Sequence, residues 1–230
     1  MEETSQTTTA NNSLTTVDLE CIRGDRILFS HLNIEIPPGK ILQIEGRNGC
    51  GKTSLLRLLC GVMMPSEGSI LWKGKDIAEE RADYYADAAY LGHHNGIKGE
   101  LTALENLHFS QALSASKSDE DLFDILARLS LRGYEDIPCR HLSAGQNRRV
   151  ALARLLATEA QVWILDAPFT ALDRKGIKVV EEIFENHVAN GGIIILTTHH
   201  PLKQDDRYYT ALNLEEAATM EAKAAACIAK

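Results

Sequence analysis

The 230-residue chain has few basic residues and no long apolar run. Its 24 lysines and arginines are outnumbered by 32 aspartates and glutamates, which gives a net charge of −8. Because a nucleic-acid surface needs clustered Lys and Arg to neutralise phosphates, this balance argues against such a partner, although Arg148 and Arg149 form a local basic spot. No stretch approaches the roughly 20 apolar residues that span a bilayer. We therefore expect membrane association, if any, through partners only.

Cysteines are also few, and none is spaced like a metal-ligand pair. There are five, an odd number, which fits a reducing cytosol and not a disulfide framework. The first residues lack the basic and apolar segments of a signal peptide. Residues 1–16 are rich in Ser, Thr and Asn, and we expect them to form a disordered lead-in.

What is present is typical of one globular α/β domain, with 44% hydrophobic and 24% charged residues. Residues 162–165 and 193–196 are continuously apolar, as in strands buried on both faces of a parallel sheet. Strands are predicted at residues 17–22, 27–36, 41–45, 69–72, 88–91, 162–166, 193–197 and 208–212. Helices are predicted at residues 54–60, 122–131, 147–157 and 177–188. Because strands and helices alternate, an α/β fold follows.

One segment departs from this alternation. Residues 101–157 lack a convincing strand and contain a polar, turn-prone stretch followed by an amphipathic helix. We interpret residues from about 95 to 157 as a helical insertion in a single domain of residues 17–212. The tail, residues 213–230, is Ala-rich, and residues 215–230 are predicted to be helical.

A complete phosphate-binding loop, Gly46-Arg47-Asn48-Gly49-Cys50-Gly51-Lys52-Thr53, lies between a predicted strand and a predicted helix. The glycines allow backbone N–H groups to turn around an anion, Lys52 adds a point charge, and the Thr53 hydroxyl is suited to Mg²⁺. A phosphate would lie at a helix N-terminus. The order of strand, loop and helix disfavours an ordinary glycine turn. We expect a nucleoside triphosphate to contact Gly46, Arg47, Asn48, Gly49, Cys50, Gly51, Lys52, Thr53 and Ser54.

Two further segments carry polar groups beside buried elements. The strand at residues 162–166 ends in Asp166, which we expect to hold Mg²⁺ directly or through water; the alternative is a turn-capping Asp. The segment Leu142-Ser143-Ala144-Gly145-Gln146 precedes a predicted helix, where backbone donors and a hydroxyl face an anion. Taken alone, this segment favours a simple helix N-cap.

Together these segments resemble the ATP-binding cassette ATPases over about residues 17–212. Five motifs occur in the family's order: the phosphate loop, a loop after residues 88–91, residues 142–146, residues 164–173, and His199. The resemblance implies a phosphate-loop NTPase core with an antiparallel β subdomain, an inserted helical subdomain, and ATP with Mg²⁺ as ligands.

In that family two cassettes pair head to tail, and ATP joins them. The resemblance therefore implies a homodimer in which Ser143 and Gly145, with Gln146 in the same segment, contact the partner's ATP. It places Asp173 at the dimer seam. It also implies that His199 contacts the γ-phosphate and positions the attacking water.

Within the family, residues 96–107, 142–155, 163–173 and 191–202 are similar to the ATPase subunit of the haem exporters of cytochrome c maturation. That similarity implies a peripheral subunit at the cytoplasmic face of the inner membrane, docked on integral membrane subunits of the CcmB and CcmC kind. Its ATP cycle would support haem delivery to a periplasmic chaperone.

Three positions depart from the family pattern. Ala167 stands where a catalytic Glu polarises the attacking water, and loss of a general base costs about 10²–10⁴-fold in rate. His94 stands where Gln ligates Mg²⁺, and imidazole can also ligate a metal; its neighbour His93 is interpreted as an exposed loop residue. Arg23 stands where an aromatic ring stacks on adenine, which a guanidinium plane can also do.

The expected function is therefore an ATPase subunit of a haem-related exporter that binds ATP but hydrolyses it slowly. Ala167 could be an engineered substitution, which the intact motifs favour, or mark a naturally impaired subunit. The alternative is a hydrolysis-impaired, nucleotide-gated regulatory or scaffold module on a membrane partner. A cassette protein of translation or DNA repair is disfavoured, because those usually carry two cassettes or long inserted coils.

Overall fold

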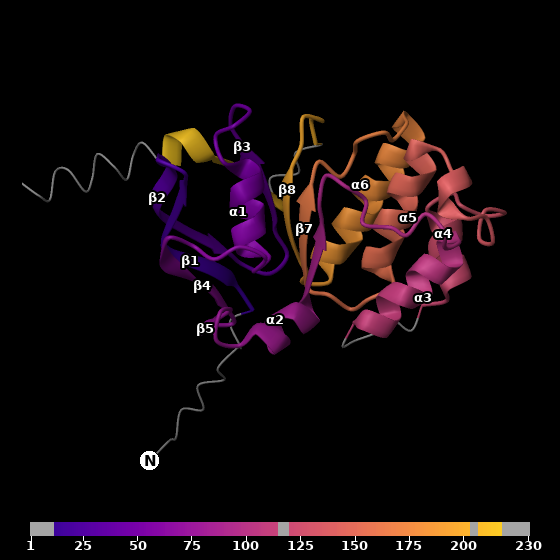
Figure 1. Cartoon of the computed structure of the whole chain (residues 1–230), viewed down its shortest axis with the longest axis horizontal. Helices are drawn as coiled ribbons and strands as arrows, with labels where there is room; N and C mark the ends of the chain where they lie inside the picture. Colours follow the sequence, from indigo (N-terminus) through magenta and orange to yellow (C-terminus); the bar gives the residue numbers. More distant parts are fainter. Residues whose placement is uncertain (1–11, 115–119, 203–206, 218–230) are drawn as a thin grey trace, which may run out of the picture.

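The computed structural model describes residues 12–114, 120–202 and 207–217, which fold into two sheets and two groups of helices (Figure 1). A five-stranded parallel sheet has the order β6-β7-β8-β3-β9, and a four-stranded antiparallel sheet has the order β2-β1-β4-β5. The α/β prediction is thereby confirmed. The strands are β1 Leu14–Arg23, β2 Arg26–Ile36, β3 Ile41–Glu45, β4 Glu67–Trp72, β5 Lys75–Asp76, β6 Ala88–Leu91, β7 Val162–Asp166, β8 Ile193–Thr197 and β9 Tyr209–Asn213.

Helix α1 lies between the two sheets, and α5 and α6 cover the opposite face of the parallel sheet (Figure 1). Helices α3 and α4 pack outside α5. The helices are α1 Lys52–Leu59, α2 Arg81–Asp87, α3 Ala103–Leu113, α4 Leu122–Arg128, α5 Ala144–Leu156 and α6 Arg174–Ala189, with a 3₁₀ turn at Cys139–His141. In the described part of the chain, none of these helices combines the length and apolar content of a membrane span.

The central strands β7 and β8 are buried along their whole length because each face packs against a different core. Trp163 and Leu165 of β7 point into the core made with α3–α6. Val162 and Ile164 point into the core made with α1 and the antiparallel sheet. Each continuous apolar run in the sequence is therefore a strand whose two faces, carried by alternate residues, are both buried.

Strand β1 begins earlier than predicted, and part of the expected lead-in is structured. Leu14 is fully buried, and the strand runs from it between β2 and β4. Strand pairing begins at Leu14 because this apolar side chain already reaches the core, although its neighbours in sequence are polar. The rest of the lead-in, residues 1–11, and most of the Ala-rich tail, residues 218–230, lie outside the described residues.

Helix α2 was not predicted from the sequence; α3 lies in the predicted helical insertion but was not identified there as a helix of its own. Helix α3 starts with a capping box in which Thr102 and Glu105 bond each other's backbone N–H groups. Its buried face carries Asn106 and Ser110, so the apolar periodicity is interrupted. The Asn106 side-chain amide is satisfied by backbone oxygens of residues 98, 101 and 102 and by a nearby cysteine sulfur.

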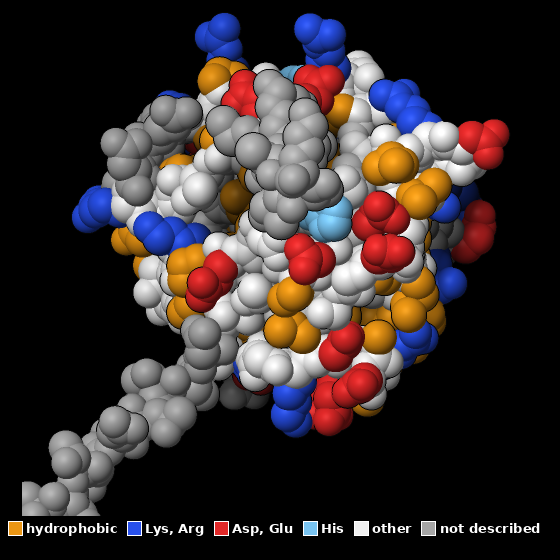
Figure 2. Space-filling model, turned by 90° about the vertical axis from the view of Figure 1, so that its left-hand side faces the viewer, with side chains coloured by type: hydrophobic (Ala, Val, Ile, Leu, Met, Phe, Trp, Pro, Cys, Tyr) orange, Lys and Arg blue, Asp and Glu red, His pale blue; other side chains and the backbone are white. Residues whose placement is uncertain are grey.

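The antiparallel sheet forms one outer face of the molecule, seen in Figure 2. Acidic side chains are spread over this face between isolated apolar ones. Exposed apolar residues on its strands include Val17, Ile22 and Ile27. On the side shown in Figure 2, basic side chains stand apart at the edges and do not form a continuous patch.

Trp163 packs against His187 at the amino-terminal end of β7, away from the carboxyl ends of the strands. The two rings stack with centroids 3.8 Å apart and an interplanar angle of 11°. His187 Nε2 lies 3.2 Å from the carbonyl oxygen of Gln161. Burial lowers the pKa of His187 from its ordinary value to about 4, although the contact with Gln161 opposes this shift. The ring is therefore held neutral at physiological pH.

We predict that this histidine makes the fold sensitive to acid. The unfolded chain binds a proton at His187 below about pH 6.5, and the folded chain binds it only near pH 4. Stability from the neutral ring is complete above pH 6.5. It is lost as the pH falls towards 4, by up to about 3 kcal/mol.

Urea unfolding at several pH values between 7 and about 4 measures this loss. His187→Phe keeps an aromatic ring beside Trp163 but removes the titration, so its free energy of unfolding should fall less on acidification. His108→Phe, at an exposed position on α3, is the matched control and should keep the native slope. Equal slopes for the native chain and His187→Phe would contradict the prediction.

Candidate functional site

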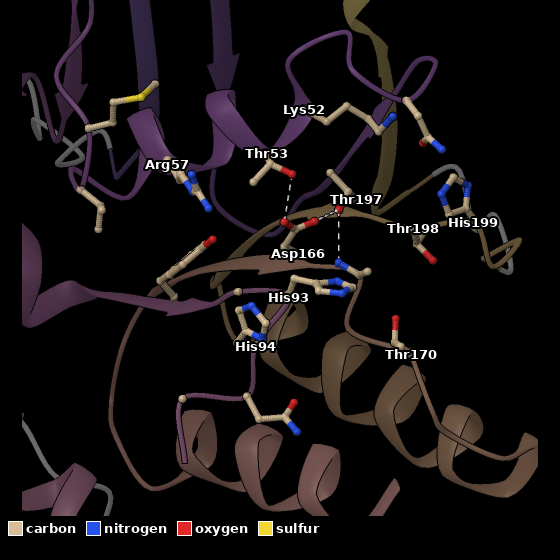
Figure 3. A pocket seen from close by; sticks show the side chains of 18 of the residues that line it. Lys52, Thr53, Arg57, His93, His94, Asp166, Thr170, Thr197, Thr198 and His199 are labelled. Carbon is tan, nitrogen blue, oxygen red and sulfur yellow. Dashed lines mark hydrogen bonds between the residues drawn. The ribbon is translucent and has the colours of Figure 1, made fainter. Parts of the chain in front are cut away.

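A cavity of about 1130 Å³ lies at the carboxyl ends of the parallel strands (Figure 3). Open α/β sheets bind ligands in this position. The side chains that line it come from the phosphate loop, the ends of β7 and β8, and the loop after β6. These segments are far apart in the sequence and converge because the strands before them are parallel neighbours.

The glycines of the phosphate loop adopt backbone angles that other residues rarely reach. Gly46, Gly49 and Gly51 have φ values of 137°, 83° and 111°. A Cβ on Gly46 would lie 2.7 Å from the sulfur of Cys50, which is buried inside the loop. This position gives Cys50 the space-filling role of a small residue in the loop.

Lys52, the first residue of α1, folds its side chain back over the loop. Its Nζ donates hydrogen bonds to the carbonyl oxygens of Gly46, at 2.6 Å, and Arg47, at 2.9 Å. The ammonium group is thus fixed at the mouth of a loop that opens onto a helix N-terminus. Both features favour an anion at this position.

Asp166 is the centre of a hydrogen-bond cluster at the floor of the cavity (Figure 3). Its Oδ2 accepts a bond of 3.0 Å from the Thr53 hydroxyl, and its Oδ1 accepts one of 2.7 Å from the Thr197 hydroxyl. Asp166 and Thr197 are paired residues at the ends of β7 and β8, and both are buried. The sequence analysis missed Thr197; its signal is a polar residue that ends a fully apolar strand.

These oxygen donors fit a hard divalent cation such as Mg²⁺. Within the described residues, no group of three or more His, Cys, Asp or Glu side chains is placed to hold a metal ion on its own. A cation here would need additional oxygen ligands from a phosphate or water. This is the usual arrangement for Mg²⁺ bound with a nucleotide.

Ala167 follows Asp166 directly and has a left-handed backbone, with φ at 49°. Its N–H donates to both the carbonyl and the hydroxyl oxygen of Thr197, each at 3.1 Å. The methyl side chain offers neither a proton acceptor nor a hydrogen bond. For a residue with a Cβ, this conformation costs about 1–2 kcal/mol, so the surrounding bonds must hold it.

The sequence has two pairs of adjacent histidines, His93-His94 and His199-His200, and three of these four residues line the cavity. His93 and His94 line it from the loop after β6, with ring centroids 5.8 Å apart, and His199 lines it from the loop after β8 (Figure 3). His93 is an exposed loop residue, as interpreted from the sequence, and it also lines the same cavity as His94. His200 does not, because its ring packs on Phe169, with centroids 5.2 Å apart, and its Nε2 lies 3.4 Å from a carboxylate oxygen of Glu181.

The segment at residues 142–146 lies outside the lining of the cavity. Ser143 caps α5 and forms a capping box with Gln146, as the simple N-cap interpretation predicts. A Cβ on Gly145 would lie 2.7 Å from the carbonyl oxygen of Ala171, so this close approach requires glycine. Ser143 is exposed and is not among the residues that line the cavity.

Asp173 also lies outside the cavity lining and caps α6. Its Oδ1 accepts hydrogen bonds from the Gly176 N–H, at 2.9 Å, and from Arg149 Nη2, at 2.6 Å. The Gly176 N–H, with a smaller contribution from Arg149, holds the pKa of Asp173 below its usual value. Arg23, the predicted base-stacking residue, is exposed and does line the cavity.

Comparison with known proteins identifies similar chains. The sequence profile described as ABC transporter matches residues 29–170. The chain is 55% identical over 185 residues to the cytochrome c biogenesis ATP-binding export protein CcmA of Methylococcus capsulatus, which covers 80% of this chain and 89% of the relative. It is 51% identical over 189 residues to the protein of the same name from Vibrio vulnificus, covering 82% and 92%.

Solved structures agree on the fold. The ATP binding subunit of an ABC transporter superposes with a TM-score of 0.76 at 26% identity, covering 87% of this chain and 86% of that one. The cbiO1 protein from Clostridium perfringens, part of the ABC transporter complex cbiONQ, gives a TM-score of 0.71 at 23% identity, covering 89% and 86%.

We predict that Lys52→Ala abolishes ATP binding, because the loop loses its fixed cation while its backbone remains. Titration with a fluorescent ATP analogue measures the affinity. Lys75→Ala is the control, since Lys75 is an exposed residue of β5 that makes only a surface ion pair with Glu80. Undiminished affinity in Lys52→Ala would show that residues 46–53 do not form the phosphate site.

Proposed function

Because the chain belongs to the ABC transporter family of ATP-binding proteins, we propose that it is the ATP-hydrolysing subunit of an export complex for haem in cytochrome c biogenesis. The ATP-binding role follows from the family, and the export role from the names of the relatives. Haem as the cargo is the further step, and it rests on the motif resemblance of residues 96–107, 142–155, 163–173 and 191–202.

The hydrogen-bond cluster of Thr53, Asp166 and Thr197 is the observation that carries this proposal. It lies beside the Lys52 ammonium, so a triphosphate in the loop meets a cation on one side and hard oxygen ligands on the other. Lys52 would exchange its bonds to the loop carbonyls for phosphate oxygens. Thr53 and Asp166, with His94 from the neighbouring loop, would hold Mg²⁺, which supplies neutralisation of phosphate charge when bound.

The hydrolytic step would depend on His199 and on the residue at position 167, both of which line the cavity. His199 would contact the γ-phosphate and orient the attacking water. Ala167 has no base to polarise that water, so turnover is slow while ATP binding is retained. Arg23 would stack on the base of the nucleotide through its guanidinium plane, and the preference for ATP over GTP rests on the family resemblance.

We place Ser143, Gly145, Gln146 and Asp173 at the ATP of a second copy of the chain. Their position outside the cavity and the exposure of Ser143 support this arrangement. In a head-to-tail homodimer with a two-fold axis, each ATP is enclosed by one phosphate loop and the partner's α5 N-terminus. The unit that pairs is the single domain of residues 17–212, with its helical insertion at about residues 95–157.

The homodimer would dock on integral membrane subunits of the CcmB and CcmC kind at the cytoplasmic face of the inner membrane. The association is peripheral, through those partners only. A second candidate is a nucleotide-gated module that dimerises on ATP and regulates or scaffolds the membrane subunits with little turnover. Ala167 is the specific observation in favour of this second function.

We predict that Ala167→Glu raises MgATP turnover by about 10²-fold or more, because it restores a general base beside the attacking water. Steady-state phosphate release in the presence of the membrane subunits measures this rate. Ala167→Gln is the matched control, since it has nearly the same shape as glutamate and no basic group. A rise in Ala167→Glu alone supports the enzyme.

Other results would change the assignment. Appreciable and equal rates in all three chains would assign water activation to another group, such as His94 or His199. No turnover in any of them would favour the nucleotide-gated module.

We also predict that the native chain forms a long-lived dimer with MgATP, because binding closes the interface and slow hydrolysis does not reopen it. Light scattering coupled to size exclusion, with saturating MgATP, measures the mass. Lys52→Ala should remain monomeric under the same conditions. A native chain that stays monomeric with MgATP and membrane subunits present would contradict the head-to-tail arrangement.

A further inference from the structure

Arg148 of α5 is buried, at 2% exposure, and all five of its N–H groups are hydrogen-bonded. Nε donates to the Pro168 carbonyl, at 3.1 Å. Nη1 donates to the Gly92 carbonyl and to Asn95 Oδ1, both at 3.1 Å. Nη2 donates to the carbonyls of Asp166, at 2.9 Å, and Ala167, at 2.8 Å.

These five acceptors belong to two segments that line the ATP cavity. Gly92 and Asn95 flank His93 and His94 in the loop after β6. The other three are consecutive backbone carbonyls at the end of β7, including that of the left-handed Ala167. One guanidinium therefore joins the metal-binding end of β7 to the loop that carries the two histidines.

The bonds to Arg148 end on neutral oxygens, with no carboxylate among them. Burial lowers the pKa of Arg148, and the nearby Asp166 carboxylate opposes this shift. A buried charge that is held by oriented dipoles is costly to disturb, because each lost acceptor leaves an N–H without a partner. Lysine has three donors and no planar fork, so it cannot reproduce this geometry.

A second arginine of α5 holds the same loop. Arg154 Nη1 donates to the carbonyls of Gly96, at 2.8 Å, and Asn95, at 3.4 Å, while its Nε donates to Ser110 Oγ, at 2.6 Å. The loop is thus bound to α5 on both sides of His93 and His94. A shift of α5 would therefore also shift this loop.

The N-terminus of helix α5 carries the capping box of Ser143 and Gln146, which we have placed against the ATP of the partner copy. The same helix therefore contacts one ATP at its N-terminus and the chain's own site through Arg148. We propose that Arg148 is a positioning residue that keeps His93, His94 and the backbone of Ala167 in register with the end of α5. Docking of the partner's ATP then sets the geometry of this chain's own site, which couples the two sites of the dimer. This inference rests on the proposed ATP-dependent dimer.

The test uses Arg148→Lys in the full-length chain, in both the native and the Ala167→Glu backgrounds. Binding of a fluorescent ATP analogue to the dilute monomer should stay within about twofold, because the phosphate loop is untouched. MgATP turnover should fall by up to about 10²-fold, the cost of a misplacement of about 1 Å. The Hill coefficient for ATP should fall towards 1.

Hydrogen exchange supplies a readout that does not need hydrolysis. In the native chain, MgATP should slow exchange of residues 92–96 when the dimer forms, and in Arg148→Lys it should not. Arg128→Lys is the matched control. Arg128 is the last residue of α4, and its guanidinium makes a surface ion pair with Glu120, so all readouts should remain native.

Asn95→Ala is a second variant, which keeps the inference testable if Arg148→Lys does not fold. It removes one acceptor of Arg148 and should lower MgATP turnover, but by less than Arg148→Lys does. Because both residues act through one contact, the double variant should lose less than the sum of the single losses.

The outcomes separate the inference from the proposed function. Normal ATP binding, dimer formation, cooperativity and loop protection in Arg148→Lys would overturn the positioning role alone. A parallel loss of ATP affinity, turnover and melting temperature would assign Arg148 to the stability of the fold only. Absence of ATP binding or of the ATP-dependent dimer in the native chain would overturn the proposed function, and the inference with it.

Discussion

The hydrogen bonds from Thr53 and Thr197 to Asp166 are the interaction on which the site depends. They join the start of α1 to the ends of β7 and β8: Thr53 is 113 residues from Asp166 in the sequence, and Asp166 is 31 residues from Thr197. They can form only if β7 and β8 are parallel and in a register that places Asp166 opposite Thr197, as the strand pairing shows. The apolar cores packed on the two faces of the sheet stabilise this register.

The parts of the site that could be predicted are those that a short stretch of sequence encodes. The phosphate loop needs several glycines with positive φ close to Lys52, so its spacing is visible in eight residues. Asp166 stands out because a carboxylate ends an otherwise apolar strand. In both cases the local sequence alone specifies the geometry, and the structure places these residues together.

The parts that could not be predicted depend on contacts distant in sequence. Thr197 has no local signal beyond its place at the end of β8. Arg148 looks in the sequence like part of a basic surface spot, and its burial could not be predicted because its five acceptors lie in segments that only the fold brings to it. Helix α3 was missed because its buried face is partly polar and is satisfied by Asn106. The start of β1 was missed because a single leucine, at position 14, anchors it among polar neighbours.

The separation of the molecule into two cores by the parallel sheet has a consequence for how the sequence can change. Residues of β7 that face α1 pack in one core and those that face α3–α6 pack in the other, so a change of side-chain size meets a different set of neighbours on each face. The surface around α3 and α4 can therefore vary more freely than Arg148 and Arg154 of α5, whose hydrogen bonds hold the loop beside the cavity. A one-residue insertion within β7 has the opposite effect, because it exchanges the two faces at once. The length of the central strands is therefore more tightly constrained than the identity of side chains on the outer helices.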